Sequence, residues 1–147
     1  MTEIESGLLV GHDGSAASGA AVTWAAQLAA RLDVPLHVLR AWSITTAPKP
    51  ATMEGGYIPP LEDFEQAVVD QLRADLDALG LPTGLEVHCH ARHDRSTTAL
   101  LEAAERVEML VVGSRGAGGF RGLGFGSTAD QVVRHSTRPV VVVPTAS

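Results

Sequence analysis

The sequence predicts an α/β protein with an open, five-stranded parallel sheet and four helices on its two faces. Short apolar runs, typical of buried strands, alternate with longer segments in which apolar residues recur every three or four positions. The chain has 147 residues, of which 45% are hydrophobic and 19% charged, so it can bury a substantial core. We expect a single domain over residues 1–147, because the alternating strands and helices along the whole chain can form one parallel sheet.

The first half of the chain is predicted to form two strands, two helices and a long loop. In order, the expected elements are strand 7–12, helix 15–32, strand 36–42, loop 43–60 and helix 61–79. Asp13 or Ser15 is expected to cap the first helix, and Pro35 separates that helix from the next strand. Four prolines and two glycines mark the surface loop, and Gly80 ends the second helix.

The second half continues the alternation and ends in a strand. The expected elements are strand 85–91, helix 96–106, strand 109–112, helix 127–135 and strand 140–143. Polar residues alternate with apolar ones over residues 85–91, which predicts a half-exposed strand at a sheet edge with Cys89 on its core side. His88, His90 and the nearby Glu86 are interpreted as a solvated polar face rather than a metal site.

Composition and charge narrow the function. Eleven basic and 17 acidic residues give a net charge of −6, which disfavours a general nucleic-acid or membrane binder. No apolar run approaches the ~20 residues of a membrane span. The start resembles no secretory signal, and Cys89 is the only cysteine, so we expect a cytoplasmic protein. Residues 113–138 nevertheless carry a local charge of +3, from four arginines and one aspartate.

A glycine-rich segment at residues 113–126 is the main candidate for a binding site. It holds seven of the 15 glycines and connects a predicted strand to a predicted helix. Glycines let backbone N–H groups approach phosphate oxygens, and Ser127 and Thr128 add hydroxyls where a helix dipole favours anions. Arg115 or Arg121 would add charge. The alternative is a glycine hinge that binds no ligand.

Two common phosphate-binding motifs are excluded. A Walker-type loop needs a lysine beside its last glycine, but the only lysine is Lys49, far upstream. The dinucleotide motif Gly-x-Gly-x-x-Gly fails because Arg121 stands where the third glycine is required after Gly116 and Gly118.

The spacing Gly113-x2-Gly116-x9-Gly126-Ser127 resembles the ATP-binding signature of the universal stress protein family. Residues 8–15 are similar to that family's first strand and acidic turn, and the resemblance extends over essentially the whole chain. It implies an adenine-nucleotide alpha hydrolase-like fold with strand order 3-2-1-4-5. It also implies ATP, with magnesium, between strands one and four, and a homodimer paired through the last strand.

The resemblance further implies which residues contact the nucleotide. The implied phosphate contacts are Gly113, Arg115, Gly116, Gly126, Ser127 and Thr128. The implied nucleoside contacts are Gly11, Asp13, Ala41 and Val112. Asp94 replaces a glycine that is frequent in the family before the third helix.

The role of the acidic turn has two interpretations. Asp13 either caps the first helix or contacts the nucleotide, and a carboxylate beside a triphosphate is tolerated if it faces the sugar or base or shares a divalent cation. We expect the nucleotide role and a regulatory stress-response protein with an unidentified protein partner. The alternatives are a slow ATPase or adenylyl-transferring enzyme that uses Asp13 and Arg115, and a ligand-independent interaction module.

Overall fold

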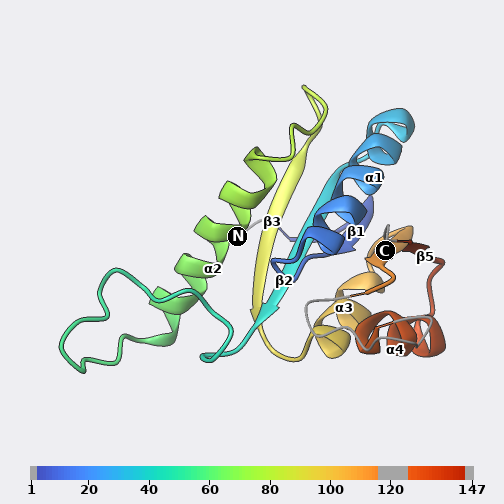
Figure 1. The fold of residues 1–147 in the computed structure, drawn as a ribbon. Coiled ribbons are helices and arrows are strands. Elements are labelled where there is room, and N and C mark those ends of the chain that lie inside the picture. Colours follow the sequence, from blue (N-terminus) through green and yellow to red (C-terminus); the bar gives the residue numbers. More distant parts are fainter. Residues whose placement is uncertain (1–2, 116–125, 145–147) are drawn as a thin grey trace.

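The computed structural model describes residues 3–115 and 126–144 and contains the predicted alternation of strands and helices (Figure 1). The strands are β1 (Leu8–Gly11), β2 (Leu36–Trp42), β3 (Val87–His93), β4 (Met109–Gly113) and β5 (Val140–Val143). The helices are α1 (Ala16–Leu32), α2 (Leu61–Asp77), α3 (Ser96–Ala104) and α4 (Ser127–His135). Within the described ranges, no helix is both long and apolar enough to cross a membrane.

All five strands are parallel and lie in the order β3-β2-β1-β4-β5. The central strand is β1, where Val10 lies opposite Val38 of β2 and Val111 of β4. The chain moves outward from β1 to β3 and then crosses back to β4, so the strand order reverses between β1 and β4. The expected fold class and strand order are therefore confirmed.

Helices cover both faces of the sheet. On one face, Val10 is fully buried in a cluster with Ala25 of α1 and Leu72 of α2. On the other face, Leu9 belongs to a second cluster with Leu100 of α3 and with residues of α4. Adjacent residues of β1 thus enter two different cores, which explains why this strand is apolar throughout rather than alternating.

The start of α1 resolves one of the sequence alternatives. Ser15 is the N-cap, and its hydroxyl oxygen accepts a hydrogen bond from the N–H of Ser18 at 3.2 Å. Asp13 lies two residues earlier and supports the cap without being it, since its carboxylate accepts a hydrogen bond from the N–H of Ser15 at 2.9 Å. Helices α2 and α3 each end two residues before the predicted boundary.

β3 is shifted by two residues from its expected range of 85–91. Gly84 has a φ of +84°, a conformation that favours glycine, and forms the turn that delays the strand. At the other end, His93 still pairs with Trp42, which extends the strand beyond the apolar–polar alternation.

The polar side of β3 is solvated at Glu86 and in part at His88, but the expectation of a solvated face was wrong for His90. His90 is 6% exposed, and His37 of β2 is 2% exposed beside it. The sequence analysis missed this because the register that places His37 opposite His88 is a tertiary feature. Cys89, on the opposite side of the strand, is partly buried at the margin of the core cluster rather than within it.

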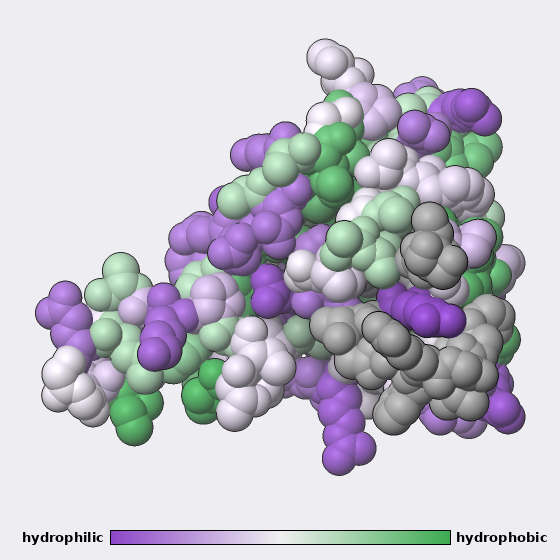
Figure 2. Space-filling view, viewed as in Figure 1, coloured by the Kyte–Doolittle hydropathy of each residue, from purple (hydrophilic) through white to green (hydrophobic). Residues whose placement is uncertain are grey.

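The loop over residues 43–60 projects from the body of the molecule, as its prolines and glycines predict (Figure 1). Figure 2 shows hydrophobic residues on this projecting loop. The exposed apolar side chains there include Ile44, Met53, Tyr57 and Ile58. A small separate cluster, with Trp42 and Phe64 at its centre, joins the base of the loop to α2.

Candidate functional site

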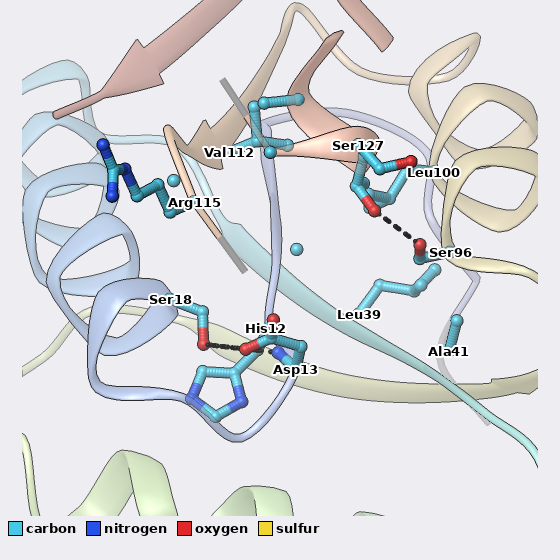
Figure 3. Close-up of a pocket in the computed structure, with 15 residues that line it drawn as sticks. His12, Asp13, Ser18, Leu39, Ala41, Ser96, Leu100, Val112, Arg115 and Ser127 are labelled. Atoms are coloured by element: carbon cyan, nitrogen blue, oxygen red, sulfur yellow. Dashed lines mark hydrogen bonds between the residues drawn. The ribbon is translucent and has the colours of Figure 1, made fainter. Parts of the chain in front are cut away.

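A pocket opens at the carboxyl ends of β1, β2 and β4, where the strand order reverses (Figure 3). In open parallel sheets this is the usual place for a ligand, because the connecting loops separate there. Nine of the ten residues predicted for the site line this pocket. They are Gly11, Asp13, Ala41, Val112, Gly113, Arg115, Gly126, Ser127 and Thr128. The tenth, Gly116, lies outside the described residues.

One side of the pocket is apolar. Leu39 and Ala41 of β2 and Val112 of β4 contribute side chains from the strands, and Leu100 contributes one from α3. Gly11 belongs to this wall, because a Cβ there would lie 3.0 Å from Cδ1 of Leu100. The absent side chain therefore keeps room beside Leu100, and this part of the pocket suits a flat, weakly polar group.

The other side of the pocket is formed by the starts of two helices. Ser96 begins α3 and Thr128 lies in the first turn of α4, and their hydroxyl oxygens are 2.8 Å apart. Neither helix has a side-chain cap, whereas α1 is capped by Ser15. First-turn N–H groups lack partners within their own helix, and the helix dipole makes that end positive. Two such ends at one pocket form a surface that favours an anion.

The backbone of α4 indicates which donors are available. The first hydrogen bond of the helix is donated by the N–H of Asp130 to Gly126, at 3.0 Å. The N–H groups of residues 127–129 come before this bond and therefore have no acceptor within the helix. The N–H of Gly126 is already used, since it donates to the carbonyl of Ser114 at 2.6 Å. The donors thus come from the first turn of the helix.

Asp13 is held in the turn that follows β1. Its Oδ1 accepts hydrogen bonds from the N–H of Ser15 at 2.9 Å and from the hydroxyl of Ser18 at 3.0 Å. The residue is exposed and lines the pocket, so a contact with the nucleotide is compatible with its position beside the Ser15 cap. The carboxylate is the negatively charged group on this rim.

His12 also lines the pocket but turns its ring away from the other labelled residues (Figure 3). Its Nδ1 accepts a hydrogen bond from the N–H of Gly14 at 3.1 Å, which requires an unprotonated nitrogen. Burial lowers the pKa of His12, against the opposing effects of Asp75 and Asp13. The neutral ring therefore helps to fix the turn and, through it, Asp13.

One expected contributor, Arg115, and the substituted position Asp94 lie away from the centre of the pocket. The guanidinium of Arg115 points away from the other labelled residues in Figure 3, although the residue lines the pocket. Asp94 does not line the pocket; its carboxylate is 3.2 Å from Arg92, which also pairs with Glu102 at 2.8 Å. This ion pair occupies the turn in which the family frequently has glycine.

The sequence analysis missed several residues of the pocket. Leu39 shares a strand face with Ala41, and Leu100 lies one turn beyond Ser96 on α3, so the strand and helix periods were the available signals. Ser18 is likewise one turn from Ser15. Within the described part of the chain, no group of three or more histidine, cysteine, aspartate or glutamate residues is arranged to hold a metal ion.

Comparison with known proteins gives a consistent result. A family model described as the universal stress protein family matches residues 7–144. A universal stress protein of Mycolicibacterium smegmatis is 33% identical over 144 residues, which cover 95% of this chain and 48% of that protein. One of Mycobacterium tuberculosis is 32% identical over 143 residues, with the same coverage of 95% and 48%. The chain spans about half the length of the curated relatives it matches.

Solved structures share the fold. A universal stress protein in complex with cAMP has a TM-score of 0.66 and 24% identity, and the match covers 99% of this chain and 100% of that one. UspA from Lactobacillus plantarum has a TM-score of 0.69 and 19% identity, over 97% and 99% of the two chains. A protein from Archaeoglobus fulgidus in complex with dAMP has a TM-score of 0.62 and 18% identity, over 95% and 98%. With a family match over residues 7–144, the chain belongs to the universal stress protein family.

Proposed function

We propose that this chain binds ATP, with magnesium, in the pocket between the ends of β1 and β4. The observation that carries the proposal is the meeting of two uncapped helix starts, α3 and α4, beside an apolar wall. The helix starts suit the phosphates, and the wall of Leu39, Ala41 and Val112 suits the base. The related structures solved with cAMP and dAMP support an adenine nucleotide as the ligand class.

The proposed roles of the site residues follow from this orientation. Ser127 and Thr128 would offer N–H and hydroxyl donors to the phosphates, together with the glycines on either side of the loop. Asp13 would face the ribose or share the magnesium ion with the phosphates, since its charge would otherwise repel them. Occupancy would then alter a surface that a protein partner reads, as in a cytoplasmic stress-response regulator.

Isothermal titration with ATP and magnesium, on protein freed of nucleotide, tests the proposal. Ser127→Pro is the sharpest variant, because proline is favoured at the first helical position but has no N–H. Gly126 already has φ −67° and ψ 166°, which suits a residue before proline. Relative to Ser127→Ala, which removes only the hydroxyl, Ser127→Pro should weaken ATP binding roughly tenfold. Absence of ATP binding by the unaltered protein would refute the proposed function.

We propose binding rather than turnover as the main chemical act. The carboxylate of Asp13 is engaged by the N–H of Ser15 and the hydroxyl of Ser18, which fits a structural and binding role better than that of a general base. The enzyme alternative makes a distinct prediction. Steady release of phosphate or pyrophosphate by the unaltered protein, at a rate well above that of Asp13→Asn, would favour the enzyme.

We also propose a homodimer that pairs through β5. Among residues 3–115 and 126–144, this strand pairs with β4 alone and is an edge strand, and its four valines make it a strong candidate for pairing with a second copy. Val143 and Pro139 direct their carbonyls to β4, at 2.8 Å from the N–H of Ser114 and 2.9 Å from that of Leu110. Alternation along the strand turns the backbone groups of the intervening even-numbered residues outward.

A further inference from the structure

Three histidine side chains, which we call the histidine cluster (His37, His88 and His90), share one face of the sheet near its outer edge. His37 of β2 lies opposite His88 of β3, and His90 is two residues further along the same face. His37 is 2% exposed, His90 is 6% exposed and His88 is partly buried. Burial of this kind disfavours the charged form of an imidazole.

One hydrogen bond joins the two most buried rings. Nδ1 of His37 lies 2.9 Å from Nε2 of His90, so one nitrogen donates and the other accepts. The accepting nitrogen carries no proton. When both rings become cations, both nitrogens carry protons and this bond cannot form. This side-chain link, which adds to the backbone pairing of β2 with β3, therefore depends on the protonation state of the pair.

The groups around the pair strengthen this dependence. The ring of His88 stacks on that of His37 with centroids 5.1 Å apart, and the Glu86 carboxylate lies 2.9 Å from Nε2 of His88. The main chain of Ser6 favours the charged form of His37 and so raises its pKa, against the larger effect of burial. The charged groups next along this face of β3 are the ion-paired Arg92, Asp94 and Glu102. Three imidazoles thus face each other beside the carboxylate of Glu86.

Low pH favours a state in which β3 has separated from β2, which we call the open state. Burial, followed by the neighbouring rings of His37 and His88, lowers the pKa of His90 to about 4. Burial and then His88 lower the pKa of His37, against the opposing effects of Ser6 and Glu86. In an opened edge, both rings would return toward about 6.5. The open state then binds more protons between about pH 4 and about pH 6.5, so opening becomes easier as pH falls through this range.

We propose that the histidine cluster is an acid-sensitive latch: protonation of His37 and His90 separates β3 from β2 and frees this edge of the sheet, while the inner strands stay paired. Helix α2 stays with the inner strands, because Leu72 of the helix is buried in one cluster with Val10 of β1 and Val38 of β2. The latch lies toward the start of β2, whereas the pocket lies at its end. This inference goes beyond the proposed nucleotide binding and does not depend on it.

Cys89 provides a reporter within the latch. It lies between His88 and His90 in β3, and its side chain is partly buried on the other face against the cluster that contains Leu72 of α2. The experiment measures its reaction with 4,4′-dithiodipyridine in the full chain, divided by the rate of free glutathione at the same pH. From about pH 7.5 to about pH 5, the normalised rate should rise on the order of tenfold.

Two variants separate the latch from a general effect of acid. The double variant His37→Asn and His90→Gln places amides where the two bonding nitrogens lie, and amides do not titrate in this range. It should react at the same normalised rate at both pH values. His135→Gln, at the exposed end of α4, is the matched control and should keep the full rise.

Three results would overturn the proposal. The first is an equal normalised rate for the unaltered protein at both pH values, and the second is a rise that persists in the double variant. The third is a loss of circular dichroism that accompanies labelling, because the opening would then be global rather than local. Histidine-ring NMR titration of the unaltered protein gives a check without variants: proton uptake by His37 and His90 must follow the same pH dependence as labelling.

Discussion

Asp13 combines a structural contact with the proposed contact to nucleotide. Its Oδ1 accepts hydrogen bonds from the N–H of Ser15 and the hydroxyl of Ser18, and the residue also lines the pocket. The structural contact needs an oxygen acceptor, whereas a contact to magnesium benefits from a full negative charge. Asparagine keeps the acceptor and removes the charge, so the two contributions can be measured separately.

Asp13→Asn should therefore weaken binding of ATP with magnesium and leave the Tm of the nucleotide-free protein within a few degrees. Asp13→Ala should weaken binding as well and should also cost about 1 kcal/mol of stability, because the donors of Ser15 and Ser18 lose their partner. Calorimetric titration and thermal unfolding check both values. Equal ATP affinity in Asp13→Asn and the unaltered protein would leave Asp13 as part of the helix cap alone.

Gly11 is a second residue of the site, and its role depends on the absence of a side chain. A side chain there would contact Leu100, which lines the apolar wall. Gly11→Val should weaken ATP binding by displacing Leu100 into the pocket, as read by titration. Gly19→Ala in α1 is the matched control, because its new Cβ would meet Cδ2 of Leu79 at an ordinary 3.4 Å. A Gly11→Val protein that is folded and binds ATP normally would place the base elsewhere.

For individual site residues, the spacing of the motifs was a better predictor than the amino-acid composition. The glycine signature and the first acidic turn led to residues that the structure gathers around one pocket. Side chains that reach the pocket through helix geometry, such as Ser96 and Leu100, have no signature of their own. Their positions depend on how α3 packs against β1, which a single sequence does not specify.

Among the elements, β2, β3 and the turn after β1 carry buried histidines that link stability to pH. Burial lowers the pKa values of His12, His37 and His90 below those of an unfolded chain. The unfolded state therefore binds more protons than the folded state below about pH 6.5. This stability is fully present above that pH and is lost as the pH falls toward about 4, the pKa of His90.

The free energy of unfolding, measured with urea, should accordingly be lower at about pH 5 than at about pH 7.5. His90→Gln should reduce this difference, because one titrating group is removed. His135→Gln, which changes an exposed histidine, should leave it unchanged. An unfolding free energy that is constant over this range, or that rises in acid, would contradict the assigned burial of these rings.

The element boundaries show where local signals fail. Helix α1 begins directly after Ser15, which is one of the two residues predicted to cap it. β3 was placed two residues too early because alternation alone set its limits, whereas Gly84 and the pairing of His93 with Trp42 set them in the structure. The same alternation suggested a solvated histidine face, because the facing residue His37 belongs to the neighbouring strand β2 but lies far away in the sequence.

For the whole molecule, the alternation of strands and helices was enough to predict a parallel sheet, and the family resemblance supplied the strand order. The sequence does not predict how the edge strands pair between two copies, because such pairing depends on a surface rather than on a local pattern. In β5, Val140 and Val142 direct their backbone groups away from β4, on the argument from the bonds of Pro139 and Val143.

Val142→Pro should therefore convert the proposed dimer into a monomer. Proline removes the outward N–H of this residue and leaves the bonds to β4 in place. Light scattering coupled to gel filtration gives the mass, and circular dichroism confirms that the sheet is retained. An unaltered protein that is already monomeric at micromolar concentration would exclude pairing through β5.

The most direct test of the central claim is a count of nucleotides carried by the protein. The chain is incubated with excess ATP and magnesium, passed rapidly through gel filtration, denatured, and the released nucleotide is identified by mass spectrometry and quantified by absorbance. We expect about one ATP per chain, as for a single-site binder. Ala41→Phe, which fills the pocket wall, should carry almost none, and Ala78→Phe, at an exposed helix end, should carry the full amount. No nucleotide on the unaltered protein, or equal amounts on it and on Ala41→Phe, would contradict the account.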